Sequence, residues 1–189
     1  MSASTPYFDT AGLHAALDSR RRALGLTWGQ VASETHVATS TMARAAHGGD
    51  MEVDGAMWLS QWLGAPYEAF LRTPGTRTFA APALRGPDLR VDAQPPGAPR
   101  WNAYHRFDTA ALHAALDAQR AQRGLTWRQV ADEIRSPLVT TGTLTGFAKG
   151  GRTGLSRLVP VLAWLGKPAE EFLTLPATAR GRAGGDLRL

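Results

Sequence analysis

The chain contains two copies of one sequence unit, and this repeat limits what it can fold into more than any other feature. Residues 8–34 (FDTAGLHAALDSRRRALGLTWGQVASE) and residues 107–133 (FDTAALHAALDAQRAQRGLTWRQVADE) are identical at 19 of 27 positions, at a constant offset of 99. The similarity resumes at an offset of 102, where Trp62 corresponds to Trp164. A unit that recurs at this length predicts two small domains of the same fold.

The repeats divide the chain into four segments. Repeat 1 covers residues 7–72 and repeat 2 covers residues 106–173. Residues 73–105 between them are rich in Pro, Gly and Ala and indicate a linker, and residues 174–189 form a basic C-terminal tail. Repeat 2 has three extra residues near Pro137, which explains the change of offset.

Each repeat begins with the signals that start and stop helices. Asp9 is a good N-cap for a first helix, and Gly25 can take the left-handed conformation that commonly ends one. A second helix is expected to begin after Thr27, where Gln30 completes a capping box. The corresponding residues of repeat 2 are Asp108, Thr126 and Gln129.

The remainder of each repeat is also predicted to be helical. In repeat 1 a third helix is expected at about residues 39–46, a fourth from near Asp54 to Gly64, and a short turn of helix after Pro66. Repeat 2 is expected to contain the same helices. No alternating pattern of apolar and polar residues indicates a strand. We therefore expect an all-α protein built from two five-helix domains in tandem.

Composition excludes several kinds of protein. The chain has 189 residues and no cysteine, so disulfides and thiolate metal sites are excluded. Its five histidines show no ligand-like spacing, no apolar run approaches the ~20 residues that span a bilayer, and the first residues lack a signal-peptide pattern. The formal net charge is +5. We expect a basic, soluble, cytoplasmic protein with no metal ion, no cofactor and no membrane partner.

Residues 26–49 (LTWGQVASETHVATSTMARAAHGG) cover the second and third predicted helices and the turn between them. Within this segment, the residues to compare with known motifs are Val31-Ala32, Val37, Thr41-Met42 and Gly48. With these residues the segment resembles the helix-turn-helix of the lambda-repressor and Cro family, also called the Xre family. Two short helices joined by a tight turn can set the second helix into the major groove of DNA. The resemblance is present in both repeats, which makes it more specific than a single match.

The resemblance implies that each repeat binds double-stranded DNA with its third helix. The implied base-reading positions are Thr39, Ser40 and Arg44 in repeat 1, and Thr141, Gly142 and Gly146 in repeat 2, with Thr145 as a further DNA-binding position. The implied phosphate-contacting positions are Trp28, Trp127 and Arg128 at the second helices, and His47, Lys149 and Arg152 after the third. Helix N-termini attract phosphate, and an arginine can form two hydrogen bonds to guanine, so the residue types suit these roles.

Four of these residues depart from the family pattern. Trp28 and Trp127 stand where the family commonly has a polar residue, and their indole N–H groups could donate to phosphate or their rings could pack on the first helix. Gly142 and Gly146 lie inside a helix, where each costs up to about 1 kcal/mol relative to alanine. Either the backbone comes very close to DNA there, or direct readout has been lost, or Gly146 leaves space for Phe147.

Charge is divided unevenly between the repeats. Repeat 1 has five basic and seven acidic residues, whereas repeat 2 has nine basic and six acidic residues. Because neutralised phosphates supply much of DNA affinity, repeat 2 with its flanks is expected to hold the DNA backbone. Asp50, Glu52 and Asp54 follow the third helix of repeat 1, where they would repel a phosphate. Trp58 is expected either to pack within the protein or to extend an aromatic surface used for association.

These observations favour a sequence-specific transcription regulator, a repressor, whose two repeats bind two half-sites of DNA. In the alternative interpretation repeat 2 binds DNA, while acidic repeat 1 mediates homodimer formation or binds a protein partner such as a toxin. An enzyme is not expected, because no nucleophile, metal or phosphate-loop pattern is present.

The predicted linker leaves the orientation of the two half-sites open. A flexible chain of 33 residues has a root-mean-square span of about 30 Å, from ~5–6 Å multiplied by the square root of its length. Half-sites one DNA turn apart are separated by about 34 Å. A flexible linker could therefore bridge them in direct or in inverted orientation.

Overall fold

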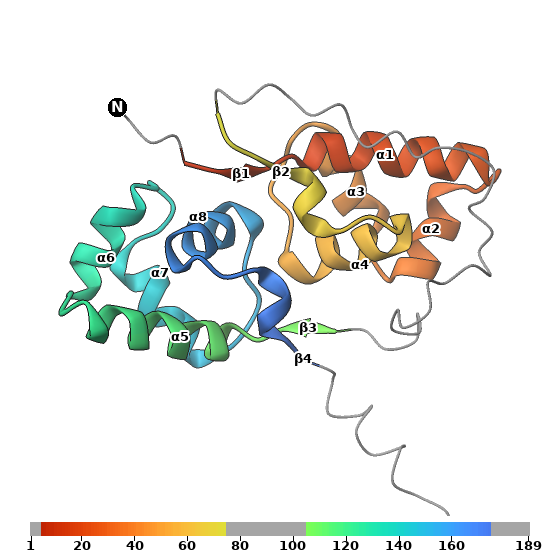
Figure 1. Ribbon diagram of the computed structural model, residues 1–189. Helices are drawn as coiled ribbons and strands as arrows, with labels where there is room; N and C mark the ends of the chain where they lie inside the picture. Colours follow the sequence, from red (N-terminus) through yellow and green to blue (C-terminus); the bar gives the residue numbers. More distant parts are fainter. Residues whose placement is uncertain (1–4, 75–104, 175–189) are drawn as a thin grey trace, which may run out of the picture.

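The computed structural model describes residues 5–74 and 105–174 (Figure 1). Most of the predicted linker and almost all of the predicted C-terminal tail lie outside these ranges. Within them every long element is a helix, so the expected helical fold class is confirmed. None of these helices has the length and apolar composition needed to cross a membrane.

The two repeats contain the same elements in the same order. Those of repeat 1 are β1 (Tyr7–Phe8), α1 (Thr10–Ala23), α2 (Trp28–Thr35), α3 (Thr39–Ala46), α4 (Val53–Leu63), the 3₁₀ helix η1 (Tyr67–Phe70) and β2 (Leu71–Arg72). Those of repeat 2 are β3 (Arg106–Phe107), α5 (Thr109–Gln122), α6 (Trp127–Ile134), α7 (Thr141–Gly146), η2 (Phe147–Lys149), α8 (Leu155–Leu165), η3 (Ala169–Phe172) and β4 (Leu173–Thr174). Each element has its counterpart at an offset of 99 or 102, with α7 and η2 together matching α3.

The predicted helix signals are confirmed. The Asp9 carboxylate accepts a hydrogen bond from the backbone N–H of Gly12 at 2.7 Å and caps α1, and Gly25 follows that helix with a φ of 65°. Thr27 and Gln30 form a complete capping box at the start of α2. Asp108, Thr126 and Gln129 make the same caps in repeat 2. The caps satisfy backbone N–H groups that a helix leaves without partners, which explains why the boundaries are readable from local sequence.

The prediction that no strand is present was wrong in one respect. The two residues before α1 pair in antiparallel fashion with the two residues after η1, with Phe8 opposite Leu71, and repeat 2 has the same pairing between Phe107 and Leu173. Strands of two residues are too short to produce an alternating pattern. The pairing joins the two ends of each repeat and places Phe8 and Phe107 in the core.

The helices of each repeat pack around leucine, valine and aromatic side chains. The buried residues of repeat 1 include Leu13, Leu17, Val31, Met42, Leu59, Leu63 and Phe70, and those of repeat 2 include Leu112, Leu116, Val130, Leu144, Leu158, Leu165 and Phe172. The apolar residues of both repeats belong to one cluster rather than to two separate cores. The repeats are therefore packed against each other.

The repeats meet at the segment between the third and fourth helices. The backbone N–H of Val53 donates to the carbonyl of Thr153 at 3.0 Å, and the N–H of Leu155 donates to the carbonyl of Met51 at 2.9 Å. Glu52 and Gly154 thus face each other as an antiparallel pair. Residues 51–53 correspond to residues 153–155 at an offset of 102. Each repeat therefore uses the same segment to contact the other.

A second contact between equivalent residues lies at η1 and η3. The Glu68 side chain and the start of η3 line one hollow, and Glu170, again 102 residues from Glu68, is close enough to affect its carboxyl group. Burial, together with this neighbouring carboxyl, raises the pKa of Glu68 to about 7. When a residue meets its own counterpart the contact is isologous, as it is on a twofold axis. Two such contacts define an approximate twofold axis between the repeats.

The remaining contacts across this axis are also reciprocal. α4 packs against β3, and α8 packs against β1 (Figure 1). On one side Asp54 accepts the backbone N–H of Phe107 at 2.8 Å, and the indole of Trp58 donates to the carbonyl of His105 at 3.0 Å. On the other side the counterparts of Asp54 and Trp58 are Ser156 and Pro160, so the scaffold is symmetric while its polar bonds are not.

We expect the cap that Asp50 provides to α8, beside Gly154, to contribute to stability. The Asp50 carboxylate binds the backbone N–H and the hydroxyl of Ser156 at 3.0 and 2.7 Å and so caps α8 from the other repeat. A Cβ on Gly154 would overlap that carboxylate. Asp50→Ala should lower the free energy of unfolding by about 0.5–2 kcal/mol, as for the loss of an N-cap. Gly154→Ala should cost a similar amount, and the double variant less than the two single losses added together.

Urea unfolding of the three variants measures these energies. Gly29→Ala is the matched control, since Gly29 lies in the first turn of α2 and a Cβ there meets only the Thr27 hydroxyl, at 3.8 Å, beyond its neighbours and its own helix backbone. If the losses of unfolding free energy in the Asp50 and Gly154 variants simply add in the double variant, the two positions do not interact.

We also expect the Glu68–Glu170 pair to make stability depend on pH. The pKa of Glu68 is raised in the folded chain, so the folded state binds the proton more tightly than the unfolded state. Its contribution should be fully present below the ordinary value of 4.5 and should be lost as the pH rises through about 7. Glu68→Gln should flatten the decrease in urea midpoint between pH 5 and 8. Parallel profiles for the variant and the wild type would contradict the raised pKa, and Glu171→Gln, which removes the ion pair with Lys167, controls for general charge effects.

Candidate nucleic-acid interface

In repeat 1 two short helices are joined by a tight turn. α2 ends at Thr35 and α3 begins at Thr39, and His36 in the turn takes the left-handed conformation with a φ of 53°. Val37 in the turn is buried, which ties it to the core beneath both helices. The two short helices are therefore present where the sequence predicted them, and their use as a DNA-binding motif stays a prediction.

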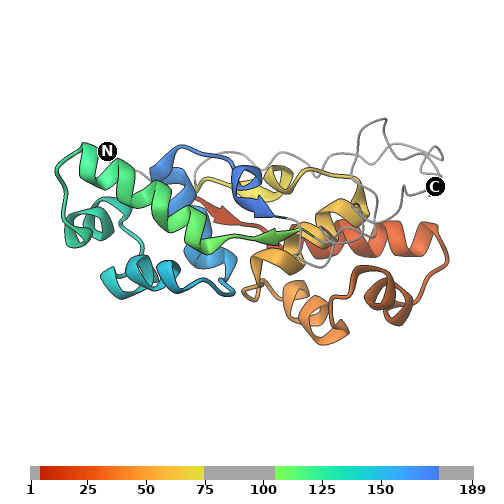
Figure 2. The same ribbon diagram turned by 90° about the horizontal axis from the view of Figure 1, so that it is seen from below.

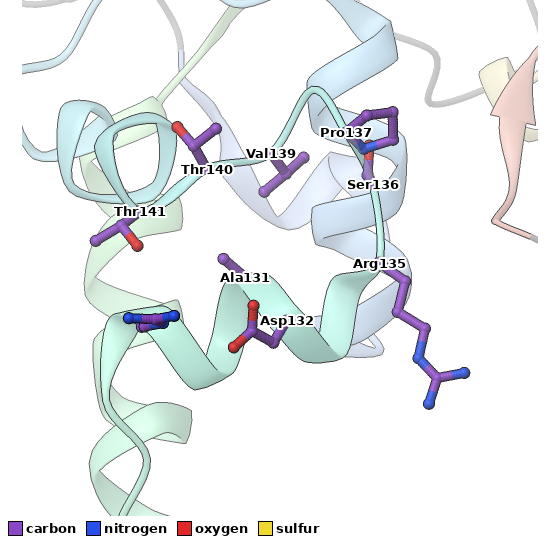
Figure 3. A pocket seen from close by; sticks show the side chains of 9 residues that line it. Ala131, Asp132, Arg135, Ser136, Pro137, Val139, Thr140 and Thr141 are labelled. Atoms are coloured by element: carbon purple, nitrogen blue, oxygen red, sulfur yellow. The ribbon is translucent and has the colours of Figure 1, made fainter.

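Repeat 2 has a longer turn between the corresponding helices. Six residues separate α6 from α7, and they include the three inserted residues, of which Leu138 is 49% exposed. The longer turn opens a hollow of about 470 Å³ between α6 and the start of α7. Figure 3 shows Thr140 and Thr141 across from Ala131 and Asp132, while the Arg135 guanidinium points away from the hollow.

The predicted base-reading side chains lie on the exposed side of the third helices. On α3 and directly after it Thr39, Ser40, Arg44 and His47 are exposed, whereas Met42 and Ala45 are buried. In repeat 2 the exposed residues are Thr141, Gly142, Thr145, Gly146 and Lys149, and the buried ones are Leu144 and Phe147. The structure thus brings the sequence-predicted residues of each repeat together on one outward face.

The two outward helices lie on the same side of the molecule. In Figure 2 both α3, in orange, and α7, in cyan, run along the lower edge. Because the repeats are packed together, these two helices are held in one relative orientation. A single extended ligand could therefore contact both.

The side chains on the two helices differ in reach. Arg44 extends from α3 and its guanidinium donates to the Thr41 hydroxyl at 3.4 Å. At the equivalent position α7 has Gly146, and the hydroxyl of Thr145 is bonded back to the carbonyl of Thr141 at 3.0 Å. α3 thus offers a long cationic donor, whereas α7 offers threonine methyl groups and backbone.

The two glycines of α7 face open space. Beyond its chain neighbours and its own helix backbone, nothing lies within 4 Å of a Cβ placed on Gly146, and Gly142 would meet only the Thr140 hydroxyl at 3.7 Å. Gly146 is exposed while Phe147 is buried, so the two residues occupy different sides of the helix. Packing against more distant parts of the described chain does not require glycine at either position.

The predicted tryptophans pack on the first helices. The Trp28 ring stacks on His14 with centroids 4.9 Å apart, and the guanidinium of Arg21 lies 5.0 Å from its centre. Trp127 is held in the same way by His113 and Arg120. The packing interpretation is therefore confirmed. Among the described residues neither indole N–H has an acceptor, so a bond to phosphate stays a prediction.

The predicted phosphate-contacting cations are exposed but not equally engaged. Within the described ranges Arg128 and Lys149 make no ion pair, whereas Arg152 pairs with Glu52 of the other repeat at 3.2 Å. Arg157 on α8, which the sequence analysis did not select, lines a hollow of about 180 Å³ together with Arg152, Gly142 and Gly146. The excess of basic residues in repeat 2 was its only signal in the sequence.

The acidic segment after α3 is used inside the chain. Asp50 caps α8, Glu52 pairs with Arg152, and Asp54 accepts the N–H of Phe107. Trp58, expected either to pack or to offer a surface for association, is half-buried and bonded to the segment before β3. These residues join the two repeats, which the sequence interpretation did not anticipate, because their partners are about 50 to 106 residues away.

The described residues hold no group of three or more His, Asp or Glu side chains that could bind a metal ion. No protein-family model, curated protein or solved structure matches this chain. The resemblance to the Xre family therefore stays a prediction.

We expect the open glycines of α7 to reduce stability. Gly142→Ala and Gly146→Ala should each raise the free energy of unfolding by roughly 0.5–1 kcal/mol, because alanine restricts the unfolded chain and favours the helix. Ala43→Gly at an exposed position of α3 is the matched control, and it should lower the free energy of unfolding by a similar amount. Urea unfolding measures all three, and a loss of stability in either alanine variant would show that the glycine is required for packing.

Proposed function

We propose that the chain is a sequence-specific DNA-binding transcription regulator, a repressor, in which both repeats contact double-stranded DNA. The observation that carries this proposal is the pair of equivalent exposed helices, α3 and α7, on the same side of the molecule (Figure 2). Each follows a helix and a turn whose inner residues are buried, so the outward residues are free for a ligand.

The chemistry of these faces suits DNA. An exposed arginine such as Arg44 suits two hydrogen bonds to a guanine, and the hydroxyls of Thr39 and Ser40 suit base edges or phosphates. In repeat 2 the exposed cations Arg128, Lys149 and Arg157 lie near the helix that has short side chains. Repeat 2 would then contribute phosphate contacts and close backbone approach, while repeat 1 contributes base readout.

The charge of repeat 1 does not oppose this role. Asp50, Glu52 and Asp54 are bonded to a helix N-terminus, an arginine and a backbone N–H of repeat 2. The alternative, in which repeat 1 forms a homodimer or binds a protein partner, depended on this acidic segment and on Trp58. Both are used between the repeats, so no observation now favours it over DNA binding.

Substitutions on the two faces should have different effects on DNA binding. Arg44→Ala should weaken binding to a selected DNA sequence by roughly 1–3 kcal/mol and relax the preference at one base pair. Lys149→Ala should instead weaken binding to all sequences alike and reduce the salt slope by about one. Titration of fluorescent duplexes at several salt concentrations measures both.

Arg22→Ala is a suitable control, because Arg22 is an exposed arginine at the end of α1 that pairs with Asp18. It should change neither base preference nor salt slope. If Arg44→Ala left affinity and preference unchanged, repeat 1 would not read DNA. If the full chain bound no duplex at any salt concentration, the proposed function would be wrong.

A further inference from the structure

The contact between the repeats is made by equivalent residues on both sides. The N–H of Val53 donates to the carbonyl of Thr153. The N–H of Leu155, the counterpart of Val53, donates to the carbonyl of Met51, the counterpart of Thr153. An antiparallel pairing of one segment with its own counterpart is symmetric about the midpoint between Glu52 and Gly154. Rotation by 180° about an axis through that midpoint exchanges the two segments.

The same axis accounts for the other contacts. Glu68 meets its counterpart Glu170, and the packing of α4 on β3 is matched by that of α8 on β1. A head-to-tail arrangement, in which repeat 2 were related to repeat 1 by translation, would bring different surfaces together. The two repeats are thus arranged as the subunits of a symmetric dimer, although they belong to one chain.

The pairing is close enough to hold this orientation. Met51, Val53 and Leu155 are each at most 2% exposed. Asp50 reaches across to cap α8, and its carboxylate lies within overlap distance of where a Cβ on Gly154 would stand, so glycine leaves room for it. The predicted flexible tether is therefore not what determines the spacing of α3 and α7, since the folded contact between the repeats determines it.

We propose that one copy of this chain binds one inverted repeat of fixed spacing in DNA, as a preassembled pair of binding domains. This inference rests on the proposed function. Two helices related by a twofold axis meet the strands of a duplex in opposite senses, so the two half-sites must be inverted. Direct repeats and half-sites of variable spacing, which a flexible linker would have allowed, are excluded by the packed arrangement.

The inverted repeat should also be imperfect. Arg44 on α3 is replaced by Gly146 on α7, and Ser40 by Gly142. The half-site under α3 should be specified at individual bases, including a guanine. The half-site under α7 should be less specific, because its helix presents backbone and the nearby cations contact phosphate. This difference gives the protein a single preferred direction on an otherwise symmetric site.

Selection from a pool of random-sequence duplexes with the full chain tests the proposal. The expected result is two sequence blocks in inverted orientation at one constant spacing, one block stricter than the other, with one chain per duplex by sedimentation. A single block, direct blocks, variable spacing or two chains per duplex would overturn the proposal and leave DNA binding intact. Recovery of no sequence at all would defeat the proposed function, and this inference with it.

Changing the spacing of the selected duplex distinguishes a packed pair from a flexible tether without altering the protein. Inserting five base pairs at the centre should reduce affinity by about 10²–10⁴-fold, the gain that a second linked contact provides. Inserting ten base pairs returns the two half-sites to the same face of the duplex but leaves them farther apart. A packed pair should bind both duplexes weakly, whereas recovery of affinity with ten base pairs would overturn the fixed spacing.

Discussion

The two backbone hydrogen bonds exchanged between residues 51–53 and 153–155 are the contact on which the arrangement of this protein depends. They bring equivalent segments together, and Met51, Val53 and Leu155 in these segments are buried. A backbone group buried without a partner costs free energy, so the two bonds offset the loss of water from these groups when the repeats pack together. The orientation of α3 relative to α7, and with it the proposed geometry of the DNA site, follows from this contact.

The two repeats keep the symmetry of the scaffold but not the chemistry on it. Asp50 corresponds to Arg152, and Trp58 corresponds to Pro160. Acidic residues on repeat 1 therefore meet a helix N-terminus and an arginine on repeat 2, where identical residues would have repelled each other. Where the same residue does occur on both sides, as with Glu68 and Glu170, burial and the neighbouring carboxyl raise the pKa of Glu68. Divergence after duplication can in this way make the pair complementary.

The outward helices show a similar division. α3 has a regular helical surface with an arginine, whereas α7 accepts two glycines that weaken a short helix. Their Cβ positions face open space, so packing elsewhere in the described chain does not explain them. Proteins commonly give up stability at positions that serve binding. Under the proposed function, a close approach of the α7 backbone to a duplex, beside the exposed Arg157, would provide such a reason.

The local sequence determined the repeat, the helices and their caps, because a capping box or a C-terminal glycine acts within a few residues. Thr27 with Gln30 and Gly25 are examples, and the structure has them as predicted. The resemblance of residues 26–49 to a known motif also pointed to Thr39, Ser40 and Arg44, which the structure has exposed on α3. Only the tertiary structure decided that the repeats pair about a twofold axis and that Asp50 and Asp54 bond to the other repeat. Those contacts join residues far apart in the chain, and their free energy depends on surfaces that exist only after each repeat has folded.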